Sequence, residues 1–105
     1  MSQSITEKET DKITNVFLDE YKKVVVINNN RNSFDFVVSI LVAYVPNMTH
    51  ESAERLATQV HKSGKATVFS GRFEDCREIA ISIGTAREKN PITGAIIDPI
   101  DVEIQ

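Results

Sequence analysis

Three consecutive carboxamides, Asn28, Asn29 and Asn30, are the first residues in the sequence that are suited to binding chemistry. Each carries an acceptor oxygen and a donor nitrogen. They follow a β-branched run and precede an apolar helical pattern, so we expect them at one edge of a group of apolar helices. Asparagine also forms turns, because it tolerates left-handed backbone conformations. From these residues alone, the three asparagines could bind a ligand or could simply form a turn.

The two histidines and the single cysteine are the other candidates for chemistry. His50 and His61 are eleven positions apart, which is not a spacing typical of metal ligands, so no metal site is predicted. His61 lies near the end of a predicted helix, where the helix dipole favours a cation, so a simple surface role is also open. Cys76 falls on an apolar helical stripe, which is typical of a small buried residue. An enzyme that uses Cys76 and His61 would need an exposed, rapidly alkylated thiol.

Common catalytic and cofactor motifs are missing from the sequence. It has no phosphate-binding loop, no dinucleotide fingerprint, no CxxC pair, no HExxH helix and no GxSxG elbow. We therefore predict a protein that is not an enzyme, with no catalytic residues and no cofactor.

Length and charge narrow the class of protein further. The 105 residues, of which 41% are hydrophobic and 26% charged, suit one compact domain. Residues 21–105 hold ten basic and ten acidic side chains, so the whole net charge of −3 lies in residues 1–20. Without a basic stripe, nucleic acid is not an expected partner. No apolar run approaches the roughly 20 residues that span a bilayer, so no membrane association is expected.

Residues 1–20 are predicted to form a mobile acidic tail before a domain at residues 21–105, because they are polar and hold few apolar groups. They show no secretory signal pattern. The lone cysteine fits a reducing compartment. We therefore expect a cytoplasmic protein whose partner is another protein.

Hydrophobic periodicity predicts six elements that would position these residues. Strands are expected at residues 24–27, 66–69 and 92–97, and helices at residues 34–45, 50–62 and 73–88. Asn32 or Ser33 would cap the first helix and Thr49 the second, while Gly64 would end the second. Regular structure is expected to end at residues 98–99. The order β-α-α-β-α-β predicts an α+β two-layer sandwich, with a three-stranded sheet covered on one face by three helices.

Four stretches of the chain resemble the ClpS adaptors of the Clp protease. They are YKKVVVINNN at residues 21–30, SFDFVVSIL at 33–41, the pattern AxxxxxxVHxxGKA at 53–66, and AREKNPIT at 86–93. The order and spacing match the family over nearly all of residues 21–97, with one extra residue between the first two helices. The VPNMT loop there is closer to the plant and cyanobacterial branch, which adds the plastid stroma as a location.

The resemblance implies an adaptor that binds N-degron substrates, which bear destabilising N-terminal residues, and brings them to a ClpA- or ClpC-type AAA+ unfoldase. It implies three groups of site residues. The substrate α-amine would be held by Asn28, Asn29 and His61. The first side chain would enter a pocket formed by Asn32, Phe34, Val37, Ala57, Val60 and Ile92. The unfoldase would dock around Glu74, Arg77 and Ile79.

Several of these positions depart from the family pattern. NNN stands where NDD is usual, so Asn29 replaces a carboxylate, and we expect weaker amine binding that Asn29→Asp would tighten. Phe34 and Ala57 stand where methionines are common, which predicts a preference for Leu over Trp as the first residue. Ile79 stands where a basic residue is usual. An alternative role is a protein-interaction module of the same fold that regulates an unfoldase without recognising N-degrons.

Overall fold

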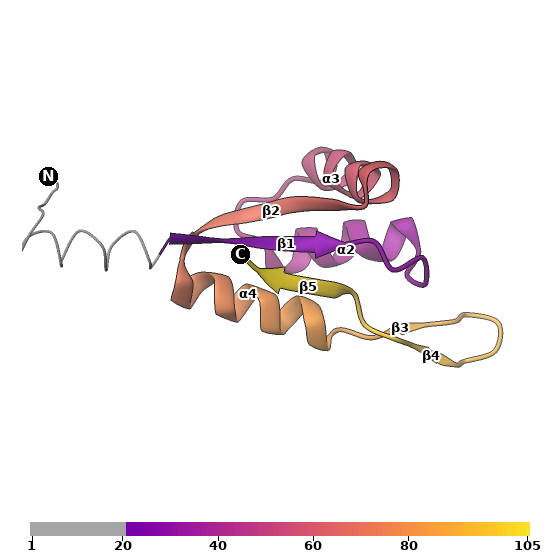
Figure 1. Ribbon diagram of the computed structural model, residues 1–105. Helices are drawn as coiled ribbons and strands as arrows, with labels where there is room; N and C mark the ends of the chain where they lie inside the picture. The colour runs from indigo at the N-terminus through magenta and orange to yellow at the C-terminus, as the bar shows by residue number, and fades with distance from the viewer. Residues whose placement is uncertain (1–20) are drawn as a thin grey trace, which may run out of the picture.

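A computed structural model describes residues 21–105, and the predicted tail at residues 1–20 lies outside the described residues. Eight elements follow in chain order: β1 (Tyr21–Ile27), α2 (Phe34–Tyr44), α3 (His50–Ser63), β2 (Lys65–Arg72), α4 (Phe73–Thr85), β3 (Glu88–Lys89), β4 (Ile96–Ile97) and β5 (Asp101–Ile104). They form an antiparallel three-stranded sheet in the order β2-β1-β5 and a separate antiparallel ribbon of β3 and β4 (Figure 1).

The central strand is β1, which pairs with β2 on one side and with β5 on the other. Its residues Val24, Val25 and Val26 are at most 3% exposed, as the uninterrupted β-branched run predicts. Val24 and Val26 point to one face of the sheet and join the main core with side chains of α2, α3 and α4. The amphipathic helices therefore cover this face and enclose one hydrophobic core.

The predicted helix caps are present. The Phe36 amide donates to Ser33 Oγ at 3.1 Å, which begins α2, and the Ser52 amide donates to Thr49 Oγ1 at 3.1 Å, which begins α3. Gly64 ends α3 with a φ of 94°, a left-handed conformation that glycine adopts without steric strain. The cap at Gly64 turns the chain directly into β2.

The predicted fold class is confirmed, because three helices pack on a three-stranded sheet in an α+β arrangement. The predicted position of the third strand was wrong. Residues 92–97 contribute only the short strand β4 of the ribbon, and β5 at Asp101–Ile104 completes the sheet. Regular structure therefore continues beyond residue 99, and α4 ends at Thr85, before the predicted residue 88.

Strand β5 was not predicted from the hydrophobic periodicity of the sequence. Its four residues alternate acidic and apolar, and Val102 and Ile104 pack against the core. Residues 92–97 are more β-branched, but they have only β3 to pair with. No helix within residues 21–105 is long and apolar enough to cross a membrane.

Candidate functional site

A small cavity brings the predicted amine-binding residues together where β1 ends. Its lining comes from β1 and the loop after it, from α2 and α3, and from the segment before β5: Val26, Ile27, Asn28, Asn29, Asn32, Val37, Val60, His61 and Ile100. Asparagine and histidine side chains form one part of this lining and aliphatic side chains form the rest. The cavity holds about 10 Å³, about the space of one water molecule.

The His61 ring is oriented by its own helix. Its Nδ1 lies 3.0 Å from the Ala57 carbonyl oxygen, one turn earlier in α3. A carbonyl can only accept, so Nδ1 carries the proton, and in the neutral ring Nε2 is then an acceptor. The Phe34 ring packs against the imidazole at a centroid distance of 5.8 Å and a tilt of 54°. His61 therefore presents an acceptor nitrogen on a ring held by one hydrogen bond to α3 and by contact with Phe34.

The asparagine loop is held by its own side chains. Asn28 Oδ1 accepts from the Asn30 amide at 3.0 Å, and Asn28 Nδ2 donates to Asn30 Oδ1 at 3.1 Å. Asn30 has a φ of 61°, which is the left-handed turn conformation that asparagine tolerates. The Asn28 amide donates to the Gly64 carbonyl at 2.8 Å, which joins the loop to the end of α3. The loop is therefore a turn that also lines a cavity.

Asn29 uses both ends of its carboxamide inside the protein. Its Oδ1 accepts from the backbone amides of Arg31 at 2.9 Å and Asn32 at 3.3 Å. Its Nδ2 donates to Asn32 Oδ1 at 2.9 Å and to the Pro99 carbonyl at 3.1 Å. A carboxylate could make the first two bonds but not the last two, because it has no donor. The amide at this position therefore connects the loop to the segment before β5.

Asn32 is the buried centre of this network, at 8% exposure. Its Nδ2 donates to Glu88 Oε1 at 3.2 Å and to the Asp98 carbonyl at 3.0 Å, and Glu88 Oε1 also accepts from the Ser33 amide at 3.0 Å. Burial alone would raise the pKa of the Glu88 carboxyl, but the hydrogen bonds from Ser33 and Asn32 outweigh it and lower that pKa below its ordinary value.

Outside the cavity, Arg31 connects the same loop to the segment before β5 and to the first residue of that strand. Its Nε lies 3.4 Å from Asp98 Oδ2, and its guanidinium also lies 3.9 Å from Asp101 Oδ1. All three side chains are about half exposed or more, so these ion pairs stabilise the loop only weakly.

The apolar lining includes three residues that the sequence analysis did not assign to the pocket, Val26, Ile27 and Ile100. Ile100 is 4% exposed and lines the cavity with Val37 and Val60. Ile92, which was predicted for this pocket, is 91% exposed and is not among the lining residues. Both isoleucines follow a proline, at positions 91 and 99, so the same dipeptide occurs twice. Pro91 and Ile92 lie in the turn of the β3-β4 hairpin, whereas Pro99 and Ile100 follow β4, so only the second isoleucine lines the cavity.

The remaining predicted pocket residues lie next to the cavity. Ala57 is fully buried in the core and contributes its carbonyl oxygen to His61. Phe34 is half-buried and contacts the imidazole ring. The structure therefore brings together Asn28, Asn29, Asn32, Val37, Val60 and His61 at one cavity, with Phe34 and Ala57 beside it.

The comparison with known protein families decides which family this site belongs to. Residues 19–94 match the model of the family described as ATP-dependent Clp protease adaptor protein ClpS. The chain belongs to the ClpS family. The protein is 38% identical over 71 residues to the ClpS adapter of Thermosynechococcus vestitus, a match that covers 68% of this chain and 74% of that one. It is 32% identical over 100 residues to the ClpS adapter of Acetivibrio thermocellus, covering 92% and 96%.

A solved ClpS structure has the same fold. The ClpS2 protein of Agrobacterium tumefaciens, bound to L-phenylalaninamide, aligns with a TM-score of 0.60 at 18% identity, over 82% of this chain and 98% of that one. The predicted resemblance to ClpS and the predicted α+β fold are both confirmed.

The three residues predicted to dock the unfoldase do not lie on one exposed surface. Glu74 and Arg77 are exposed on α4. Ile79 is 7% exposed and belongs to the core. Successive residues of a helix are about 100° apart, so Ile79 lies roughly opposite Arg77. Ile79 instead forms part of a surface groove with Tyr44 and Phe69.

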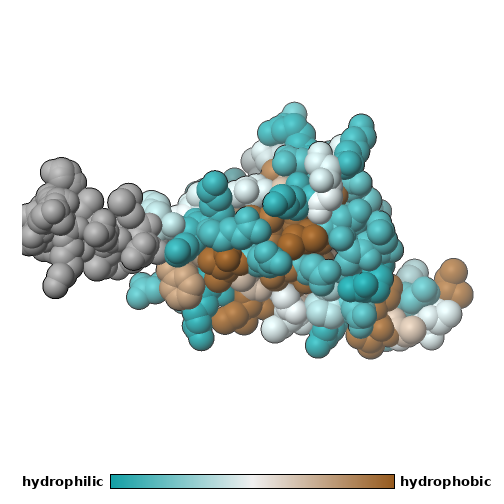
Figure 2. Space-filling model, viewed as in Figure 1, coloured by the Kyte–Doolittle hydropathy of each residue, from teal (hydrophilic) through white to brown (hydrophobic). Residues whose placement is uncertain are grey.

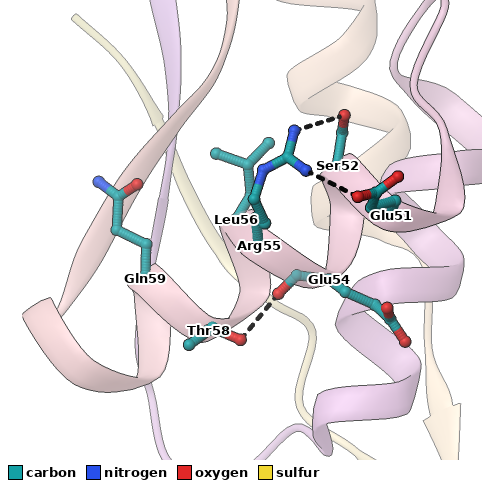
Figure 3. A pocket seen from close by; sticks show the side chains of 7 residues that line it. All are labelled: Glu51, Ser52, Glu54, Arg55, Leu56, Thr58 and Gln59. Atoms are coloured by element: carbon teal, nitrogen blue, oxygen red, sulfur yellow. Dashed lines mark hydrogen bonds and ion pairs between the residues drawn. The ribbon is translucent and has the colours of Figure 1, made fainter.

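A larger hollow in this ClpS chain, of about 760 Å³, is a shallow depression along α3 (Figure 3). Every residue that lines it belongs to that one helix. Arg55 lies 3.6 Å from Glu51 and 3.1 Å from Ser52. Glu54 lies 3.2 Å from His50, so the charged side chains of the depression already have partners within the same helix. No other element contributes a group to this depression, and the small cavity remains the candidate site.

Cys76 lacks the exposure that a nucleophile needs. It is fully buried, and its thiol donates toward the Lys22 and Gly71 carbonyls at 3.4 and 3.7 Å. Burial raises the pKa of the Cys76 thiol, which disfavours the reactive thiolate. Within residues 21–105, no three His, Cys, Asp or Glu side chains cluster closely enough to hold a metal ion.

Proposed function

We propose that this protein binds the free α-amino group and the first side chain of N-degron substrates, and delivers them to a ClpA- or ClpC-type AAA+ unfoldase. The observation that carries the proposal is the joint placement of Asn28, Asn29 and His61 around one cavity with an aliphatic floor. The relative from Agrobacterium tumefaciens is described with a bound amino acid amide, which has the same chemistry as the start of a protein chain.

The donor and acceptor pattern suits an ammonium group. An α-amino group has a pKa of about 7.7–8.0, so near neutral pH it is mostly an ammonium with three donors. Oxygens of the asparagine loop and His61 Nε2 are acceptors of the required kind. An acetylated or internal residue has no ammonium and is bulkier at the same place, so only a true N-terminus would bind.

The expected affinity is modest. Two hydrogen bonds to a charged group contribute about 1.5–3 kcal/mol each, and burial of one large apolar side chain adds about 1.5–3 kcal/mol. The sum of about 4.5–9 kcal/mol, before ordering costs, corresponds to millimolar to micromolar dissociation constants. Such affinity suits an adaptor that must release its substrate.

The size of the cavity requires a rearrangement on binding. About 10 Å³ cannot accept a leucine side chain, so a bound first residue must displace neighbouring side chains. Phe34 is the best placed to move, because it is only half-buried and contacts His61. This requirement also favours a second candidate function, a regulator of an unfoldase that does not recognise N-degrons.

Fluorescence titration with two labelled peptides that differ only in N-terminal acetylation tests the proposal. We expect the free peptide with Leu at position one to bind and its acetylated form to bind at least tenfold more weakly, as loss of one charged hydrogen bond predicts. A series with Leu, Phe and Trp at position one tests the expected preference for Leu. If no free-amine peptide binds while an unfoldase N-terminal domain does, the regulator is the correct function.

A further inference from the structure

We propose that the hairpin at residues 88–97 is a second contact for the bound substrate, which takes apolar side chains at the residues after the first. This inference rests on the proposed function, because it assumes that a substrate N-terminus occupies the adjacent cavity.

The hairpin exposes large apolar side chains to an unusual degree. Ile92 is 91% exposed and Ile96 is 63% exposed, and Pro91 and Ala95 beside them are exposed too. The hairpin projects from the body of the protein past the loop after β1 (Figure 1), and hydrophobic surface is visible on this projection (Figure 2). Single exposed apolar residues are common, but these gather on one projecting element.

These side chains are carried on an ordered turn. Asn90 Oδ1 accepts from the backbone amides of Ile92 at 2.8 Å and Thr93 at 3.1 Å. The Asn90 amide donates to the Ala95 carbonyl at 2.9 Å, and the Gly94 amide donates to the Asn90 carbonyl at 2.8 Å. A turn with these bonds loses little conformational freedom when a ligand docks on it, which favours binding.

Both ends of the hairpin meet on a residue that lines the cavity. Glu88, its first residue, and Asp98, the residue after its last, both accept from Asn32 Nδ2, at 3.2 and 3.0 Å. On this proposal, a chain whose first residue fills the cavity leaves across this rim, where Asn32 contacts both ends of the hairpin. Ile96 is two residues from Asp98 and so at most about 7 Å from the rim, while three extended substrate residues reach about 10 Å, which brings substrate positions two to four within range of the hairpin.

A titration with matched ligands separates this contact from the cavity. One ligand is leucinamide, and the other two are peptides that begin with Leu and carry either apolar residues or Ser and Gly at positions two to four. They are titrated into the wild type and into the double variant Ile92→Ser/Ile96→Ser. Tyr21→Ser is the control variant, because Tyr21 is 65% exposed and starts β1, at the far end from Asn28.

We expect the wild type and the Tyr21→Ser variant to bind the apolar peptide about tenfold more tightly than the polar one, as burial of one large side chain predicts. In the double variant this ratio should fall to about twofold, while leucinamide binds as tightly as before. Unchanged leucinamide binding also shows that the cavity of the variant is folded.

Three results would overturn the inference. The wild type could show no preference between the peptides, or the double variant could keep the full preference. Sedimentation could show that the wild type is a dimer and the double variant a monomer, which would assign the hairpin to a second copy of the chain. Failure of leucinamide to bind the wild type would instead reject the proposed function, and with it the inference about the hairpin.

Discussion

At the scale of one residue, the proposed binding role of Asn29 competes with its structural role. The proposed function assigns its oxygen to the substrate ammonium, but that oxygen already accepts from the Arg31 and Asn32 amides. Its nitrogen donates to Asn32 and to the Pro99 carbonyl. A carboxylate would attract an ammonium more strongly but would place an unpaired oxygen against that carbonyl. The amide therefore favours a stable loop over tight binding.

Asn29→Asp should bind free-amine peptides more tightly and at the same time lower the free energy of unfolding by about 1–3 kcal/mol, through two lost donor bonds. Peptide titration and urea unfolding measure the two effects separately. Asn30→Asp is the matched control, since it adds the same charge at an exposed neighbour whose oxygen accepts from Asn28. An Asn29→Asp protein as stable as the wild type would contradict the structural role of the amide.

Glu88 makes the stability of the protein depend on pH. Its pKa in the folded protein is lowered, so its contribution to stability is fully present above the ordinary glutamate pKa of about 4.3 and is lost as the pH falls through the lower folded value. Glu88→Gln should therefore lose stability at neutral pH and show a flatter loss of stability in acid. Urea unfolding across this pH range measures both, with the exposed Glu78→Gln as control.

Among the secondary-structure elements, those with strong local signals were predictable from the sequence. The buried run of β1, the caps at Ser33 and Thr49 and the left-handed Gly64 are local properties, and each is present in the structure. The partner of a strand is not a local property. Residues 92–97 have the higher β-propensity, yet β5 completes the sheet because it reaches the free edge of β1.

The same limit applies to the candidate site. Family spacing predicted the asparagines, His61, Val37 and Val60, which do line one cavity. It selected Ile92 over Ile100 because the first Pro-Ile dipeptide matched the family pattern. The bond from Asn29 to the Pro99 carbonyl could not be predicted either, because Pro99 is 70 residues away in sequence.

The two isoleucines should differ sharply in their effect on stability. Ile100→Ala should lower the free energy of unfolding by about 2–5 kcal/mol, because it leaves a void in a buried position. Ile92→Ala should change it by less than about 0.5 kcal/mol, because the side chain is exposed. Parallel urea titrations measure both, and equal effects would contradict the placement of Ile100 at the cavity floor.

At the scale of the whole molecule, stability depends on the pairing of an early strand with a late one. β1 is the middle of the sheet, and the backbone groups of Lys23 and Gln105 bond reciprocally at 2.7 and 2.8 Å. A chain ended after residue 97 would lose Ile100 and all of β5, and it should show no cooperative unfolding transition. Thermal melting followed by circular dichroism checks this, and a sharp transition in the shortened chain would show that β5 is dispensable.

The reach of Asn29 and Asn32 to the carbonyls of Pro99 and Asp98 has a consequence for synthesis in the cell. The asparagine loop leaves the ribosome long before these two carbonyls do. A nascent chain therefore displays its asparagines without the supports that orient them until residues 98 and 99 have emerged. Under the proposed function, a copy that ends before residue 98 would not compete with the folded protein for substrates.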